Sequence, residues 1–266
     1  MVSKNSQGKL TFGGHLEVLR RMLFRIIAVV GVFSIVVFLC KDAVWKLLLA
    51  PSEYNFFTYR WIESVLNRIG IVFHFDEFHI DLITTDLSSQ FMRHITTSLY
   101  LGLLGASPYI LFELFHFVAP ALYENEKKYS GMALFIIYVL FILGVLMSYY
   151  VLFPISFRFL GTYSVAERVR STITLDSYVS TFTTLTLLMG VFFQLPVIAF
   201  ALAKLGIINF DMLSKYRKHA LLIIMLVAAI ITPPDLMTLV LVALPLYLLY
   251  EVSIKITYLV DRHLNQ

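Results

Sequence analysis

The chain has 266 residues, of which 59% are apolar and 14% are charged, and its net charge is only +4. Ordinary soluble domains are about 45–50% apolar and about 25% charged, so a mean hydropathy of +0.82 excludes a cytosolic enzyme, a disulfide scaffold and a disordered chain. The basic residues are scattered over loops instead of forming a stripe, which excludes a nucleic-acid binder, and lipid is the expected solvent for most of the protein.

The apolar segments, taken in chain order, predict six membrane-spanning helices. A spanning helix needs about 20 apolar residues, a length reached by residues 22–40, 96–119, 131–153 and 180–203. The next apolar stretch is interrupted by Thr232-Pro233-Pro234-Asp235, where two successive prolines break the helix. The last two helices, over residues 220–231 and 236–250, are therefore expected to be short, reaching about 18 and 23 Å. A re-entrant hairpin is the alternative for this pair.

The lysines and arginines predict which way the chain crosses the bilayer. Six spans place thirteen of them on the side of the N-terminus and eight on the other side, where they are spread over two long loops. Both termini are therefore expected to be cytoplasmic. The first apolar segment is expected to be retained as a span, because Lys41-Asp42-Ala43 after it offers no cleavage site with small residues.

Helical caps are expected on the outer face. In the connection over residues 41–95, apolar side chains recur at helical spacing: Trp61, Val65, Leu66 and Ile69. The connection over residues 154–179 is expected to form a similar cap. The predicted fold class is an all-α polytopic membrane protein, and residues 1–266 form a single domain without internal repeats.

Polar residues inside the spans are costly and are therefore functional candidates. The long stem of Arg25 can snorkel to the cytoplasmic interface. Glu113 is expected to hydrogen-bond a neighbouring helix. Gln194 lies in the fourth span two residues before Pro196, which bends the helix; its amide either joins two helices or offers a polar contact within an apolar face, and the sequence slightly favours the first.

Charged residues near the helix ends have structural interpretations as well. Thr232-x-x-Asp235 reads as a capping box with Pro233 and Pro234 in the first helical turn. Glu17 and Arg20 are spaced to pair on one helix. Glu124 and Glu126, in the connection after the second span, can bind a cationic partner through charge-assisted hydrogen bonds.

Catalytic and metal-binding patterns are missing from the sequence. It contains no HExxH, GxSxG or GxxxxGK[ST] motif. Four metal-capable side chains stand together in the outer loop, but at a spacing that matches no known ligand set: His74, Asp76, Glu77 and His79. We therefore expect neither an enzyme nor a bound metal or cofactor.

Four motifs are specific in combination, by their order and separation. They are Phe12-x-x-His15-Leu16-Glu17-x-Leu19-Arg20; Phe117-Val118-Ala119-Pro120-Ala121-Leu122-Tyr123-x-x-Glu126; Phe193-Gln194-Leu195-Pro196-Val197; and Thr232-Pro233-Pro234-Asp235 followed by Pro245 and Leu249-Tyr250-Glu251. With these motifs the chain resembles the TatC family, the multispanning core of the twin-arginine protein translocase, from about Phe12 to Tyr258.

This resemblance implies a receptor and translocation core in the bacterial inner membrane, with six helices forming a concave wall. Members of the family bind the twin-arginine signal peptides of folded precursor proteins at the cytoplasmic face. They associate with TatA-like and TatB-like single-span subunits, form homo-oligomers within the complex, and use the proton-motive force. A small-solute secondary transporter is the alternative function, although the chain lacks the repeat symmetry of that class.

The resemblance also implies roles for individual residues. Glu126 would accept the guanidinium groups of the signal, and the same patch would include Phe117, Tyr123, Glu17 and Arg20. Gln194 and Pro196 would lie in the concave face, near a partner helix or the apolar segment of the signal. Pro51 and Asp235 would support the outer loops. The chain departs from the family at Val18, where a glutamate is usual; Glu17, Glu113 and Glu124 are the candidates for a second acceptor.

Overall fold

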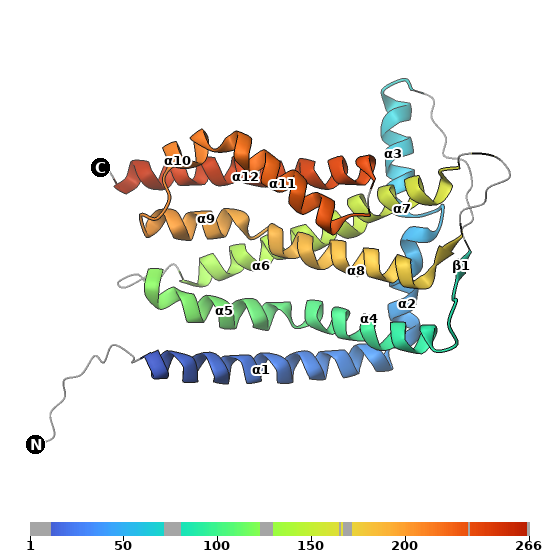
Figure 1. Ribbon diagram of the computed structural model, residues 1–266, viewed down its shortest axis with the longest axis horizontal. Coiled ribbons are helices and arrows are strands. Elements are labelled where there is room, and N and C mark those ends of the chain that lie inside the picture. The colour runs from blue at the N-terminus through green and yellow to red at the C-terminus, as the bar shows by residue number, and fades with distance from the viewer. Residues whose placement is uncertain are drawn as a thin grey trace, which may run out of the picture.

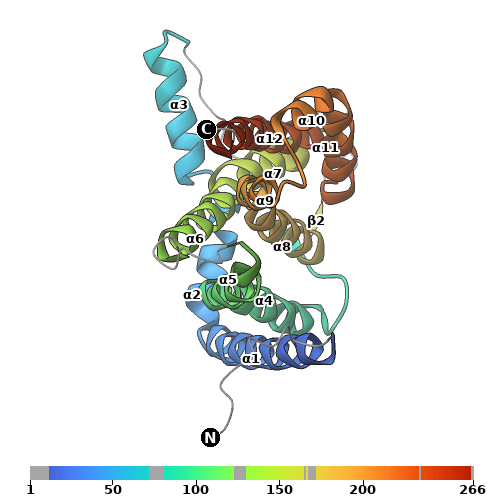
Figure 2. The ribbon, with the colours of Figure 1, turned by 90° about the vertical axis from the view of Figure 1, so that its left-hand side faces the viewer.

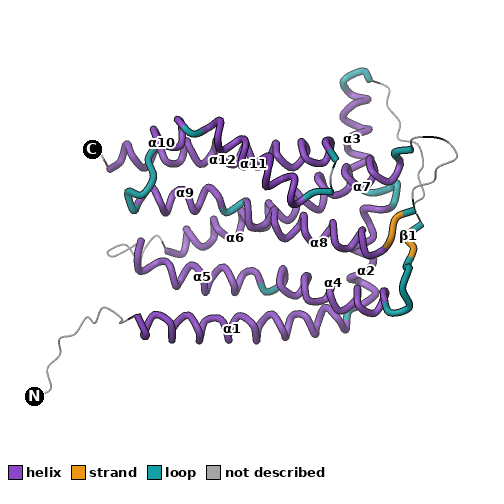
Figure 3. Tube along the Cα trace, in the orientation of Figure 1, coloured by secondary structure: helices purple, strands orange, loops and turns teal. Residues whose placement is uncertain are grey.

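The computed structural model describes residues 12–71, 81–122, 130–164, 166, 172–233 and 235–264, which are almost entirely helical (Figure 3). Two short strands, β1 (Leu82–Ile83) and β2 (Ile173–Thr174), pair in parallel. The long helices run along a common axis, and the start of α1 and the end of α12 lie at the same end of the bundle (Figure 1), which we call the terminal end. The opposite end is the loop end.

The helices that run along the bundle axis are α1 (Phe12–Leu39), α4 (Ser89–Gly105), α5 (Ser107–Leu122), α6 (Ser130–Met147), α7 (Phe153–Thr162), α8 (Leu175–Phe192), α9 (Leu195–Lys204), α11 (Arg217–Ile231) and α12 (Leu236–Leu264). The loop end also carries α2 (Lys41–Leu49), a 3-10 turn (Ala50–Ser52) and α3 (Phe57–Arg68), so the helices predicted between residues 41 and 95 are present. The small helix α10 (Phe210–Lys215) lies near the terminal end.

Four helical stretches of the described residues are long and apolar enough to cross a membrane: Leu16–Leu39, Gly131–Thr162, Leu175–Lys204 and Leu236–Arg262. A fifth crossing is obtained if α4 and α5, which are bent by 53° relative to each other, form one span. The remaining predicted span is α11, whose 15 residues reach about 22 Å. The chain is therefore a multi-pass helical membrane protein, and the full count of six stays a prediction.

Prolines account for the interruptions inside the spans. A proline has no N–H to donate to the carbonyl four residues earlier. Pro108 follows the bend between α4 and α5, Pro154 follows the π-helical turn Ser148–Leu152 that joins α6 to α7, and Pro196 follows the break between α8 and α9. Where the sequence predicted a bend at Pro196, the structure shows a break between α8 and α9, although the two helices together form one apolar stretch, Leu175–Lys204. The third span continues to Thr162, well beyond its predicted end at residue 153, because α7 follows the π-helical turn without a gap.

The prediction that both of the last two helices are short is wrong for the second of them. α11 is short, but α12 continues for 29 residues to Leu264, although its expected end was residue 250. Pro245 lies inside α12 without ending it, as membrane helices tolerate. The apolar run stops near Tyr250, but helical backbone geometry continues through the more polar residues that follow.

The core lies between α7, α8, α11 and α12, toward the loop end. Phe153 contacts Tyr178 and Phe182 edge-on, with ring centroids 5.0 Å apart in both pairs. These rings pack with fully buried aliphatic side chains, including Leu185 and Leu246. At one edge of the bundle, α1 packs mainly against α4 (Figure 2). The core therefore anchors the second half of the chain, whereas α1 is attached through a single layer of helices.

Candidate functional site

The first candidate surface is at the terminal end, where α1 begins. The Glu17 carboxylate accepts a hydrogen bond from Arg21 Nε at 3.0 Å and lies 4.0 Å from Arg20 Nη1. The predicted pairing of Glu17 with Arg20 is thus present, and Arg21 makes the closer contact. All three side chains are exposed. The terminal end therefore presents to its surroundings a carboxylate that is already paired with two guanidinium groups.

Of the other residues in the predicted signal-binding patch, the structure describes Phe117 but not Tyr123 or Glu126. Phe117 lies near the C-terminal end of α5 and is 39% exposed. Tyr123 and Glu126 lie outside the described residues. The described part of α5 ends at Leu122, and Figure 1 places this end of α5 at the terminal end, beside the start of α1. The patch is therefore partly assembled in the described residues.

An ion pair with a buried carboxylate joins α1 to α5 further along the bundle. Arg25 Nη1 lies 3.1 Å from Glu113 Oε1, and the Tyr109 hydroxyl donates to the same oxygen at 2.7 Å. The predicted contact of Glu113 with a neighbouring helix is confirmed. The guanidinium of Arg25, which the sequence suggested could reach the cytoplasmic interface, instead pairs with the Glu113 carboxylate. Sequence reasoning missed Tyr109, although its spacing of four residues before Glu113 on one helix was an available signal.

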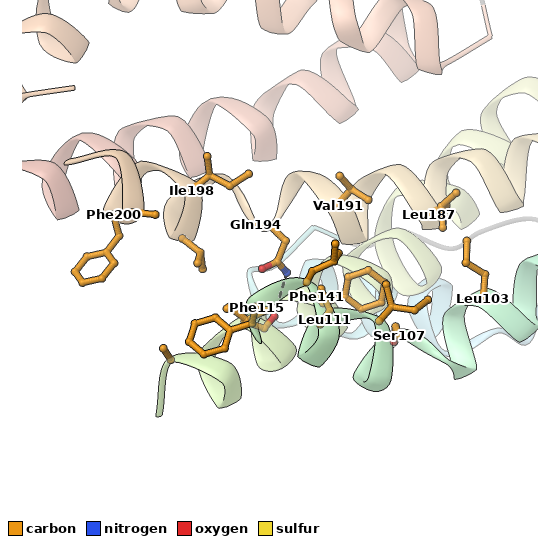
Figure 4. A pocket seen from close by; sticks show the side chains of 16 residues that line it. Leu103, Ser107, Leu111, Phe115, Phe141, Leu187, Val191, Gln194, Ile198 and Phe200 are labelled. Atoms are coloured by element: carbon orange, nitrogen blue, oxygen red, sulfur yellow. Dashed lines mark hydrogen bonds between the residues drawn. The ribbon is translucent and has the colours of Figure 1, made fainter. Parts of the chain in front are cut away.

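Gln194 lies in an apolar groove of about 430 Å³ between α4, α5, α6, α8 and α9 (Figure 4). Its amide Nε2 donates to the backbone carbonyl of Ile137 on α6 at 3.0 Å. This bond joins two helices, which is the role the sequence favoured. The groove also holds Ser107, a fully buried residue whose hydroxyl has no partner among the described residues and which the sequence did not suggest.

Pro196 lies on a second groove that adjoins the first. This groove, of about 450 Å³, runs between α6, α9 and α12, and the two grooves share Ala133, Val197 and Phe200. Gln194 and Pro196, which the sequence grouped together, thus line two adjoining grooves. Both grooves are almost wholly apolar, so each fits an acyl chain or an apolar helix in preference to a polar solute.

At the loop end, Pro51 is buried and helps to hold α3. The hydroxyl of Tyr59 on α3 donates to the carbonyls of Pro51, at 3.0 Å, and Pro154, at 2.9 Å. Burial raises the pKa of the Tyr59 phenol, and the positive charge of Arg158 offsets only part of this rise. Tyr59 therefore stays protonated and able to donate. Nothing in the sequence pointed to it, because an isolated tyrosine carries no positional signal.

Asp235 caps α12, but the capping box expected from the sequence is wrong. The helix begins at Leu236, and Asp235 Oδ1 accepts from the backbone N–H of Thr238 at 2.7 Å, which makes Asp235 itself the N-cap. Thr232 is the C-cap of the preceding helix, α11, and its hydroxyl donates to the carbonyl of Ala228. Pro233 therefore lies in the connection between α11 and α12 and not in the first turn of α12.

The described part of the chain contains no metal-binding site: no group of three or more His, Cys, Asp or Glu side chains there is placed to hold an ion. The cluster of His74, Asp76, Glu77 and His79 lies outside those residues. The described candidate sites are thus an exposed set of charges at the terminal end, one interhelical ion pair and two apolar grooves.

Comparison with known proteins gives a family for this arrangement. Residues 14–245 match the family described as Sec-independent protein translocase protein (TatC). The TatC protein of Blattabacterium sp. subsp. Periplaneta americana is 31% identical over 267 residues, covering 97% of this chain and 99% of that protein. The TatC protein of Campylobacter jejuni subsp. jejuni is 30% identical over 247 residues, covering 93% of each.

The fold agrees with this sequence similarity. A crystal structure described as the twin arginine translocase receptor TatC superposes with a TM-score of 0.75 at 30% identity, covering 93% of this chain and 99% of that chain. A second crystal structure of this receptor, in the detergent DDM, gives a TM-score of 0.74 over 91% of this chain. The chain therefore belongs to the TatC family of Sec-independent protein translocase proteins, a transport component of the membrane.

Proposed function

We propose that this chain is the core subunit of a twin-arginine translocase, and that it binds the twin-arginine signal peptides of folded precursor proteins. In this proposal it lies in the bacterial inner membrane with both termini in the cytoplasm, works with TatA-like and TatB-like single-span subunits and further copies of itself, and uses the proton-motive force. The observation that supports the proposal most is membership of the TatC family, together with similarity over nearly the whole chain to a protein described as the twin arginine translocase receptor.

Glu126 is the proposed acceptor for the signal arginines. A carboxylate can hold the planar guanidinium group through two parallel hydrogen bonds. Glu126 follows the described end of α5 by four residues, and that end lies at the terminal end of the bundle. Phe117 and Tyr123, which flank the same segment of sequence, are proposed to shape the surface on which the signal lies.

Glu17 is the weaker of the two proposed acceptors. The family usually carries a glutamate at the position of Val18, and Glu17 is rotated from it by about 100° around the helix. Its carboxylate is already paired with Arg20 and Arg21, so a signal arginine has to displace one of them. In this proposal Arg20 competes with the signal arginines for the Glu17 carboxylate and is displaced when the signal binds.

The groove that contains Gln194 is the proposed contact for an apolar helix, either a single-span partner or the apolar segment of the signal. Its walls are apolar, and the hydroxyl of Ser107, unpaired among the described residues, is buried behind them. Pro196 lines the adjoining groove, which shares side chains of α6 and α9 with the first. Pro51 and Asp235 are proposed to keep the loop end rigid through the hydrogen bonds of α3 and α12.

The test of the proposed acceptor is crosslinking between this chain in membranes and a precursor with a photoreactive residue beside its twin arginines. Glu126→Lys is expected to lower the yield by about tenfold or more, because a hydrogen bond to a charged group contributes about 1.5–3 kcal/mol. Glu53→Lys makes the same charge change at the loop end, on an exposed residue, and should leave the yield unchanged. Equal yields with all three chains, or with a signal carrying two glutamines, would refute the proposal.

A further inference from the structure

Helix α3 differs from the spanning helices in direction. Figure 1 shows it standing across the bundle axis at the loop end, close to the level at which α1 ends. Figure 2, which looks along the bundle from the terminal end, shows α3 extending outside the outline of the other helices. A spanning helix such as α1 leaves the hydrocarbon near its end. A helix at that level that also projects sideways lies where the surface of the surrounding bilayer is expected.

The first turn of α3 fixes which face of the helix points back along the bundle. The carbonyl of Tyr150, to which Pro154 cannot donate, accepts a hydrogen bond from the Thr58 hydroxyl. The ring of Phe57 meets the ring of Tyr150 edge-on at 6.0 Å. Tyr150 belongs to a helical stretch that is long and apolar enough to cross a membrane, Gly131–Thr162, so the side of α3 that carries Phe57 and Thr58 is turned back toward the spanning helices.

A row of apolar residues continues that face outward along α3. Side chains four residues apart lie on the same side of a helix, and the row consists of Phe57, Trp61, Val65 and Ile69. Three of its members are largely exposed: Phe57 by 64%, Trp61 by 56% and Ile69 by 69%. The bundle therefore leaves most of this row uncovered, although it fixes the direction in which the row points.

Polar residues flank this row along one side of α3. Arg60, Ser64 and Asn67 are exposed on it, and Arg68 lies at the outer end of the helix. A helix with one apolar face that carries tryptophan and phenylalanine, and with arginine beside it, is suited to a membrane surface. Tryptophan favours that interface because its ring is apolar and its N–H can still donate. Arginine can reach lipid phosphates from the same level.

We propose that α3 is an interfacial helix, with the row Phe57, Trp61, Val65 and Ile69 inserted among the phospholipids of the outer leaflet. Arg60 and Arg68 lie at the level of the phosphate groups. The partner of this surface is thus the lipid itself and not another protein. Thr58 and Tyr59 attach the helix to the bundle, and the lipid covers the part that the bundle leaves open.

The fluorescence of Trp61 tests this proposal, since the chain has only two tryptophans. The full chain with Trp45→Phe is reconstituted in phosphatidylcholine vesicles in which lipids brominated near the top of the acyl chains replace part of the ordinary lipid. Trp61 is expected to emit at short wavelength, to lose most of its emission to the bromines, and to be little affected by iodide on both sides of the membrane. The emission and quenching of Trp61 can also be obtained with Trp45 unchanged, by subtracting the signal of Trp61→Phe from that of the unmodified chain.

The matched control moves the indole to the polar side of the same turn. In the triple variant Trp45→Phe, Trp61→Phe, Arg60→Trp, the tryptophan should respond to iodide and be protected from the bromines. Strong quenching of Trp61 by iodide would mean that the row faces water, and quenching by neither agent would mean that a protein surface covers it. Either result would overturn the proposal.

Discussion

Arg25 on α1 and Glu113 on α5 form an ion pair in which the two partners differ greatly in burial. Arg25 Nη1 and Glu113 Oε1 are 3.1 Å apart, and the two side chains are 60% and 10% exposed, respectively. The arginine can therefore turn toward the interface if its partner is removed. The glutamate has no such alternative, and would keep only the hydroxyl of Tyr109 as a donor to its carboxylate.

This asymmetry predicts unequal costs for the two single substitutions. Arg25→Met should lower the free energy of unfolding by about 1–3 kcal/mol, because an unpaired carboxylate remains buried. Glu113→Gln should cost less, since its amide oxygen can still accept from Tyr109 and Arg25 is free to turn outward. Denaturation of the purified protein in mixed micelles, followed by circular dichroism, measures both values.

The double variant Arg25→Met, Glu113→Gln is the control, because a double-mutant cycle isolates the coupling between the two groups. It should be more stable than Arg25→Met alone, since the buried charge is removed together with its partner. If Glu113→Gln were the more costly single change, or if the two costs simply added, the ion pair would not hold α1 against α5.

Gln194 offers a second test of attachment between helices. Its Nε2 donates to the carbonyl of Ile137 at 3.0 Å, where the break between α8 and α9 leaves the backbone without a continuous helix. Gln194→Leu should destabilise the protein by only about 0.5–1.5 kcal/mol, because hydrogen bonds between membrane helices are modest and the carbonyl also lies within α6. Thermal unfolding in detergent measures the loss.

Gln90→Leu is the matched control for that substitution, because Gln90 is exposed at the start of α4. It should change the stability by less than Gln194→Leu does. If the groove is a docking surface, Gln194→Leu should also reduce crosslinking to a precursor whose photoreactive residue is placed in the apolar segment of the signal instead of beside the arginines. Unchanged stability together with unchanged crosslinking would remove Gln194 from both roles.

The positions of the spans were accessible from the sequence because membrane helices are selected by the length of their apolar runs. The run of residues 22–40 marks α1, and the prolines at positions 233 and 234 mark the connection before α12. Apolar length says little about where helical geometry ends. α12 continues past its apolar part to Leu264, and α4 begins at Ser89, before the run that predicted it.

Contacts between distant elements could not be read from local patterns. The capping box was wrong because Thr232 and Asp235 both fit a cap, and only the three-dimensional path of the chain shows that Asp235 alone caps α12. The partner of Glu113 is Arg25, which precedes it by 88 residues. Spacing rules join residues within one helix, so they suggested Glu17 with Arg20 but not this pair.

Close approach of backbones fixes α1 against α4 at a glycine. A methyl group added to Gly102 on α4 would lie 2.7 Å from the Cα atom of Ser34 on α1, which is closer than real contacts allow. The obstacle is backbone, so a change of side-chain rotamer cannot relieve it. By contrast, Gly31 lies one turn away on α1, and a methyl group there would meet nothing within 4 Å.

Gly102→Ala should therefore destabilise the protein by about 1–3 kcal/mol, the range for overpacking a close contact, and should loosen α1 in particular. Gly31→Ala should be neutral or slightly stabilising, because alanine is the better helix former by about 1 kcal/mol. Hydrogen exchange of the α1 amides in micelles distinguishes the two: protection should fall throughout α1 in Gly102→Ala while the core helices α8 and α12 keep theirs. Equal protection in the two variants would show that α1 does not depend on its contact with Gly102.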